Sequence, residues 1–139
     1  MPFVPFQYRT WCKKMDWKSG QLSSAPEVVY DGDTAYFFKD GGERNYSNQP
    51  CRFYGIQCAE MNATDPLVKE KAIAARDFVR AAILGKQVWL QSIAMDPHGR
   101  PVVIVWFNEE DMGDRSKSLN RKLLDLRHAV PYLQTKGVL

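Results

Sequence analysis

The sequence predicts a small closed β-barrel of the OB type with added helices, in the order β-β-β-α-β-β-α. Three observations lead to this fold class. The chain has 139 residues, which is enough for one domain with a real hydrophobic core. Five short apolar segments are separated by residues that favour turns, and one helical pattern falls between the third and the fourth. Five short strands with a helix in that place suit an OB-type barrel.

Composition narrows the class of protein further. The chain is 45% hydrophobic and 25% charged, which is typical of a folded globular domain and argues against extensive disorder. Its net charge of +3 is too small to indicate nucleic acid binding by itself. No run of eighteen apolar residues occurs, so no transmembrane helix is expected, and the start lacks the apolar core of a secretory signal. Three cysteines without CxxC spacing predict free thiols in a reducing intracellular compartment.

Three regions are expected along the chain: a tail over residues 1–25, the barrel domain over 26–133 and a short tail over 134–139. The first segment shows neither helical nor strand periodicity, but it mixes aromatic and basic residues. Its aromatics are candidates either for anchors on a protein partner or for a cover over the barrel. These aromatics are Phe3, Phe6, Trp11 and Trp17.

The first three strands are expected around two turns. EVVY (27–30) and TAYFFKD (34–40) flank Asp31-Gly32-Asp33, and Gly41-Gly42 marks the next turn. CRFYGI (51–56) follows as the third strand. Each run is short, apolar and rich in aromatic or β-branched residues, as expected for strands that bury one face.

A long amphipathic helix follows the third strand. Asp65-Pro66 supplies a capping residue and a proline at the first helical position, and Gly85 follows the last apolar residue. Between them, apolar residues recur at three- and four-residue steps from Val68 to Ile83. The pattern therefore predicts a helix that lies on the barrel with one face buried.

The last part of the chain predicts a hairpin and a second helix. KQVWLQSIA and RPVVIVWFN are expected strands, joined by a turn at Asp96-Pro97-His98-Gly99. After a polar stretch, apolar residues from Leu119 to Val130 repeat at helical spacing, and Pro131 is expected to end that helix.

Three groups of residues carry possible chemistry. Asp31 and Asp33 share a face if the chain is extended, which suits a hard cation, although an Asp-Gly turn bonded to its own backbone explains them equally simply. Arg52 and Glu60 combine a phosphate-binding guanidinium with a carboxylate able to activate water, or form an ordinary ion pair. Arg100 follows a turn, where it stabilises a phosphoryl group or is simply solvated.

These groups occur in an order that resembles one known family. VVYDGDT, RFYGIQCAE, DPHGRPVVIVW and LNRKLLDLRHAVPY are similar to successive motifs of staphylococcal nuclease-like (thermonuclease) domains, over roughly residues 27 to 133. The resemblance implies an OB-fold barrel that cleaves single-stranded DNA or RNA phosphodiesters with calcium. It assigns the phosphate to Arg52, the attacking water to Glu60 and the transition state to Arg100.

The same resemblance implies a metal site and two substrate contacts. Asp33, Gln57 and the backbone carbonyl of Cys58 occupy the positions of calcium ligands. Gln57 stands where the family carries an aspartate, and a neutral amide there implies a weakened calcium site. Tyr132 and His98 match positions that contact the substrate. The alternative is a catalytically degenerate module that acts as an accessory subunit of a larger assembly, a reading that Gln57 and the aromatic tail also suit.

Overall fold

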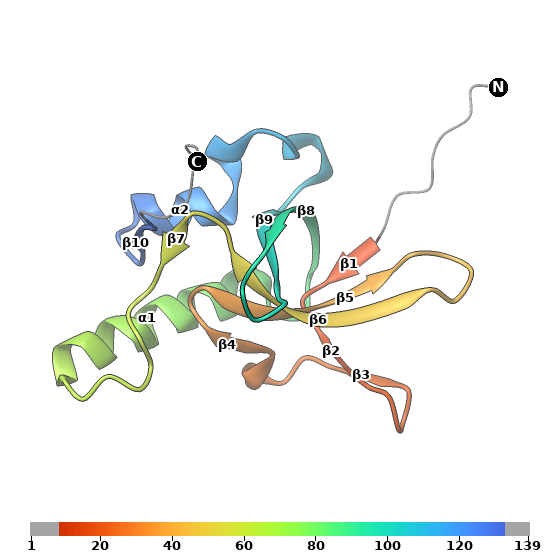
Figure 1. The fold of residues 1–139 in the computed structure, drawn as a ribbon, viewed down its shortest axis with the longest axis horizontal. Helices are drawn as coiled ribbons and strands as arrows, with labels where there is room; N and C mark the ends of the chain where they lie inside the picture. Colours follow the sequence, from red (N-terminus) through yellow and green to blue (C-terminus); the bar gives the residue numbers. More distant parts are fainter. Residues whose placement is uncertain (1–8, 133–139) are drawn as a thin grey trace.

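A closed, mixed β-barrel of five strands forms the centre of the protein in a computed structural model that describes residues 9–132 (Figure 1). Around the ring the strands follow the order β1-β8-β9-β6-β5, and a further pairing of β1 with β5 closes it. All these pairs are antiparallel except β6 with β9, which is parallel. The ring strands are β1 (Arg9–Trp11), β5 (Thr34–Asp40), β6 (Tyr46–Phe53), β8 (Gln87–Met95) and β9 (Pro101–Trp106).

Two α-helices lie at one side of this barrel, and the hairpins of β5–β6 and β2–β3 project on the other (Figure 1). The helices are α1 (Pro66–Ile83) and α2 (Leu119–Asp125). The short strands outside the ring are β2 (Lys14–Asp16), β3 (Gln21–Ser23), β4 (Val29–Asp31), β7 (Ile56–Gln57) and β10 (Val130–Pro131). Single 3₁₀ turns are η1 (Pro26–Val28), η2 (Glu109–Asp111) and η3 (Arg115–Lys117).

The long predicted helix is confirmed as α1. The Asp65 side chain accepts a hydrogen bond from the backbone N–H of Leu67, which satisfies one of the free donors of the first turn. Gly85 follows the helix with φ of +75°, a conformation that glycine adopts without strain. Four residues of its apolar stripe are fully buried, namely Ala72, Ala75, Val79 and Ile83.

Two expected elements end earlier than predicted. The third strand stops at Phe53, because Tyr54 and Gly55 turn the chain before the two residues of β7. The predicted last helix ends at Asp125 and not at Pro131, since Arg127 adopts φ of +61° and reverses the chain. Leu126 and Val130, which the helical stripe was expected to bury, are 50% and 62% exposed.

The region expected to be an N-terminal tail contributes to the barrel. β1 pairs with both β5 and β8, and it takes the place in the ring that the pattern assigned to residues 27–30. Cys12, which follows β1, is fully buried in the core. β1 is only three residues long and its partners lie far along the chain, so no local periodicity could reveal it.

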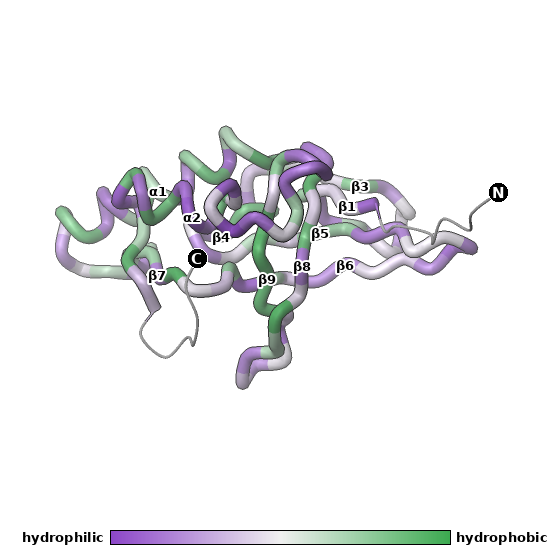
Figure 2. Tube along the Cα trace, turned by 90° about the horizontal axis from the view of Figure 1, so that it is seen from above, coloured by the Kyte–Doolittle hydropathy of each residue, from purple (hydrophilic) through white to green (hydrophobic). Residues whose placement is uncertain are grey.

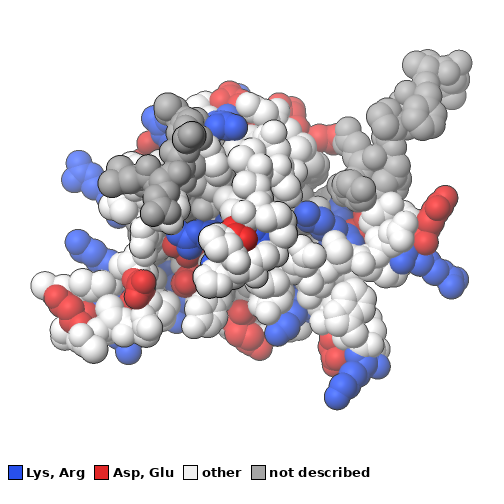
Figure 3. All heavy atoms as spheres, viewed as in Figure 1, with Lys and Arg blue, Asp and Glu red and all other residues white. Residues whose placement is uncertain are grey.

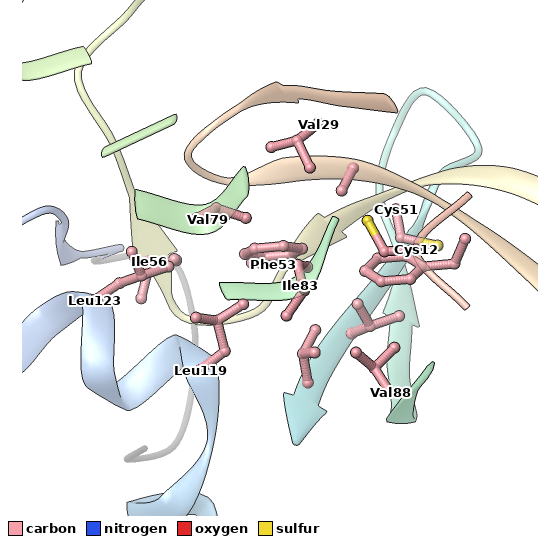
Figure 4. Close-up of a cluster of buried hydrophobic side chains, with 14 of the residues drawn as sticks. Cys12, Val29, Cys51, Phe53, Ile56, Val79, Ile83, Val88, Leu119 and Leu123 are labelled. Carbon is pink, nitrogen blue, oxygen red and sulfur yellow. The ribbon is translucent and has the colours of Figure 1, made fainter. Parts of the chain in front are cut away.

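The hydrophobic core lies between the barrel and the helices. Phe53 is 1% exposed and packs among side chains that α1 and α2 contribute, including Val79, Ile83 and Leu119 (Figure 4). Apolar residues concentrate in β9, whereas the tips of the projecting hairpins are polar (Figure 2). The core holds the end of β6, and this fixes the position of the residues that follow it.

Candidate functional site

Four of the predicted site residues line one groove of about 550 Å³. Arg52 comes from the end of β6, whereas His98 and Arg100 come from the turn between β8 and β9. Tyr132 follows β10, where its backbone N–H donates to the Gly55 carbonyl at 3.0 Å. Two guanidinium groups and an aromatic ring that are distant in sequence therefore share one hollow.

Arg52 is held by three neighbours. Its Nη2 donates to the Ile56 carbonyl at 3.4 Å, and its Nη1 lies 3.5 Å from Oδ2 of Asp33. The guanidinium carbon also lies 5.3 Å from the centre of the Tyr132 ring, within cation–π range. These contacts orient the arginine along one wall of the groove, and its charge is partly balanced by Asp33.

Arg100 is bound by Asp96, its neighbour across the hairpin turn. Its Nε donates to Oδ2 of Asp96 at 2.7 Å, and its backbone N–H donates to Oδ1 at 2.8 Å. The same Oδ1 accepts from the backbone N–H of His98 at 2.9 Å. Burial acts to raise the pKa of Asp96, but the hydrogen bonds from Arg100 outweigh it and lower that pKa. The turn thus fixes Arg100, while the His98 residue stays exposed.

Asp33 is a buried carboxylate that connects two strand ends. Its Oδ2 accepts from the backbone N–H of Cys58 at 3.0 Å, and its Oδ1 accepts from the Thr34 hydroxyl at 3.3 Å. The preceding Gly32 has no room for a side chain, because a Cβ there would lie 2.7 Å from Sγ of Cys58 and 2.8 Å from Cβ of Ala75. Gly32 therefore lets the Asp-Gly-Asp turn press against α1 and Cys58.

Asp31 lies beside Asp33 in the same turn. Its Oδ1 accepts from the backbone N–H of Asp33 at 3.0 Å. Burial, together with the hydrogen bond to the Asp33 carboxylate and its charge, raises the pKa of Asp31 to about 7. Below about pH 7 the Asp31 carboxyl therefore keeps its proton.

Three other predicted residues line a second hollow, of about 620 Å³. Gln57, Cys58 and Glu60 contribute to it, and both Gln57 and Glu60 are exposed. Burial raises the pKa of the Cys58 thiol well above its usual range, with the nearby carboxylates as the next cause. Within residues 9–132 no ion pair includes Glu60, so Arg52 pairs with Asp33 and not with Glu60. Asp33 contacts residues of both hollows and lies between them.

The fit of this site to calcium rests on the two aspartates. A pair of adjacent, partly buried carboxyl groups suits a hard cation as well as it suits a shared proton. Gln57 stands exposed on β7, and the described part of the chain holds no cluster of three or more His, Cys, Asp or Glu side chains placed to bind a metal. Both oxygens of Asp33 already accept hydrogen bonds, and a calcium site that includes Asp33, Gln57 and the Cys58 carbonyl stays a prediction.

The aromatic residues expected at a partner interface are divided. Phe3 and Phe6 lie outside the described residues. Trp11 packs on the barrel, with its ring centre 6.3 Å from that of Phe38. Trp17 sits in the turn between β2 and β3 and is 61% exposed. One of the two described anchors therefore covers the barrel and the other remains on the surface.

Sequence reasoning missed the contact of Asp96 with Arg100 and the raised pKa of Asp31. Asp96 was expected only as a turn residue, yet it binds Arg100 through two hydrogen bonds. The signal was present in DPHGR, because an aspartate that opens a turn commonly accepts from the backbone two residues later. Asp31 was recognised as a neighbour of Asp33, but its raised pKa depends on burial, which spacing does not reveal.

Comparisons with known proteins leave the family open. No protein-family model matches the chain, and no curated protein matches it. No helix among residues 9–132 is both long and apolar enough to cross a membrane. The class that fold and site define is a closed barrel with two α-helices and an arginine-lined groove.

Proposed function

We propose that the protein is a staphylococcal nuclease-like domain of the OB type that hydrolyses phosphodiester bonds of single-stranded DNA or RNA, with a weakened calcium site. The observation that carries this proposal is the groove in which Arg52 and Arg100 come together beside Tyr132. Guanidinium groups bind phosphate oxygens through paired hydrogen bonds, and an aromatic ring offers a base a stacking surface. A single strand of nucleic acid suits a groove of this size.

Each residue has a defined task in that reaction. Arg52 binds the phosphate, and Arg100 stabilises the negative charge that grows on it as a fifth oxygen approaches phosphorus. Glu60 takes a proton from water, the new O–P bond forms, and the bond to the leaving oxygen breaks. That oxygen takes a proton from solvent water, and Glu60 returns its proton to solvent. Glu60 is exposed and has no ion-pair partner among the described residues, so it is available for this role. Asp33 positions Arg52 and the Cys58 backbone.

Calcium would be held by the Asp31–Asp33 carboxyl pair, with Gln57 as a neutral ligand in place of an acid. When bound, the ion would offset charge on the phosphate and favour ionisation of the water. The neutral Gln57 predicts weak binding, because calcium affinity depends on the number of charged ligands.

A second candidate function is favoured by a specific observation. Both groove arginines already contact carboxylates, Arg52 with Asp33 and Arg100 with Asp96. Their charge is thus partly balanced, and Trp17 remains exposed as a potential anchor. These features suit an accessory module that serves a larger assembly without turnover.

Hydrolysis of labelled single-stranded DNA and RNA across a calcium titration separates the two functions. The wild-type protein is expected to cleave at high calcium, whereas Glu60→Gln should fold and bind but not cleave. Glu70→Gln is the matched control, since Glu70 is an exposed acid on α1 outside both hollows. Absence of cleavage by the folded wild-type protein at saturating calcium refutes the enzyme and leaves the accessory module.

A further inference from the structure

The second hollow carries basic residues that the proposed reaction does not use. Lys71 from α1 and Arg127 from the turn after α2 both line it, as Glu60 does. In the view of Figure 3 basic and acidic side chains are intermixed, without an extended surface of one sign. Any attraction for an anion must therefore come from local groups such as these two.

Neither cation is balanced by a neighbouring acid. Within residues 9–132 no ion pair includes Lys71 or Arg127, whereas Arg52, Arg100 and Arg121 all contact carboxylates. Glu60 is the one acidic residue in this lining, and it lies beyond ion-pair distance of both. Lys71 and Arg127 are exposed, so their charges are accessible to a ligand.

The backbone at Arg127 has a left-handed conformation that residues other than glycine adopt less often. The His128 N–H donates to the Leu123 carbonyl at 2.9 Å, and the Arg127 N–H donates to the Leu124 carbonyl at 3.0 Å, which together form a Schellman motif. Arg127 occupies the position of that motif where glycine is favoured, with φ of +61°. An arginine there is strained, and glycine would close the helix better.

The neighbouring residue fixes this segment against α1. The His128 ring packs on Phe78 of α1, with ring centres 4.9 Å apart. The turn that presents Arg127 is therefore anchored on the same helix that carries Lys71. The two cations approach the hollow from separate, packed elements, as a preformed binding site requires.

We propose that Lys71 and Arg127 form a second phosphate subsite, which binds the phosphate adjacent to the one held by Arg52 and Arg100. This inference rests on the proposed function, and it specifies the ligand as a polynucleotide strand with at least two phosphates. Asp33 contacts Arg52 in the groove and the Cys58 N–H in the hollow, so the two phosphate positions flank one side chain. Glu60 lines the hollow that holds the second phosphate.

The test is binding of a fluorescein-labelled thymidine octanucleotide, followed by anisotropy across a sodium chloride titration with calcium chelated. A plot of log K against log salt has a negative slope, and on single strands each lost phosphate contact reduces the magnitude of that slope by about 0.7. Lys71→Ala with Arg127→Gly should therefore reduce the slope by about 1.4. Lys69→Ala removes a charge from the same helix outside the hollow and should leave the slope unchanged. Lys71→Ala with Arg127→Lys should recover about half of the lost slope, because the cation at position 127 returns.

The outcomes separate this inference from the function on which it rests. Arg127→Gly must keep a melting temperature at or above that of the wild type, so that loss of binding reports the side chain and not the fold. An unchanged slope in the double variant, with a lower slope in Arg52→Ala and Arg100→Ala, overturns the second subsite and leaves the groove intact. No binding by the wild type at the lowest salt overturns both.

Discussion

The raised pKa of Asp31 predicts that one isosteric substitution stabilises the protein at alkaline pH. In the folded state the Asp31 carboxyl keeps its proton up to about pH 7, whereas its ordinary pKa is 3.8. Between these values the folded state binds more protons than the unfolded state, so stability falls as the pH rises. Asp31→Asn removes this dependence, because an amide stays neutral and its oxygen can still accept from the Asp33 N–H.

The size of the stabilisation expected for Asp31→Asn follows from the shift in the pKa of Asp31. A rise in pKa from 3.8 to about 7 corresponds to roughly 4 kcal/mol at full weight. Asp31 is only partly buried, and solvent screening reduces this to about 2 kcal/mol. Asp31→Asn should therefore match the wild type near pH 4 and exceed its free energy of unfolding by about 2 kcal/mol above pH 7.

Urea denaturation at a series of pH values measures this difference directly. Asp96→Asn is the control of opposite sign, because hydrogen bonds from Arg100 lower the pKa of Asp96. Its substitution should destabilise the protein at neutral pH, and the loss should shrink as the pH falls through the lowered pKa. If the advantage of Asp31→Asn is the same at every pH, or is a loss above pH 7, the reasoning about the carboxyl pair is wrong.

Three further substitutions test the packing around the site, each by urea denaturation. Gly32→Ala should cost about 2 kcal/mol, because the new Cβ would meet Sγ of Cys58 at 2.7 Å and Cβ of Ala75 at 2.8 Å; a cost under ~0.5 kcal/mol contradicts the close approach. Arg127→Gly should stabilise by up to about 1 kcal/mol by removing strain at φ of +61°, and clear destabilisation contradicts it. Asn120→Ala should cost about 3 kcal/mol, since it removes three buried hydrogen bonds, to the Val105 N–H and to the Tyr54 and Val103 carbonyls; a loss below ~1 kcal/mol contradicts this.

Local signals in the sequence were enough to predict the elements whose ends are set by nearby residues. Asp65-Pro66 and Gly85 delimit α1, and the turn from Asp96 to Gly99 joins β8 to β9 as expected. In these cases the capping and turn residues act within a few positions of the backbone groups they satisfy. The prediction therefore needs no knowledge of distant contacts.

Long-range contacts account for the parts that the sequence did not predict. β1 closes the ring by pairing with strands that begin 25 or more positions later, and its three residues carry no periodic pattern. The helical spacing of Leu126 and Val130 suggested a longer α2, but backbone strain at Arg127 is invisible to a pattern of apolar residues. Such features depend on which surfaces meet after folding.

The candidate site was also predicted only in part, because its residues could be identified but not their arrangement. Residue types and their order could suggest Arg52, Arg100 and Glu60 as a phosphate-processing set, but not that the arginines would share a groove while Glu60 lined the next hollow. Asp33 contacts residues of both regions. Its buried carboxylate lies beside Arg52 of the groove and accepts from the N–H of Cys58, which lines the second hollow. Its contact with Cys58 joins chain segments 25 positions apart, beyond the reach of motif spacing.

The protonation state of Asp31 affects both the stability of the barrel and the charge near the groove. When Asp31 is protonated, Arg52 is balanced by Asp33 alone, and the local charge available to a phosphate is greatest. When Asp31 ionises, a second negative charge enters the same turn and opposes the binding of an anion. A cation at the carboxyl pair would have the same effect as the proton, because it cancels that charge. The Asp31→Asn variant fixes the neutral state at every pH, and so it separates the electrostatic contribution of this turn from any requirement for a metal.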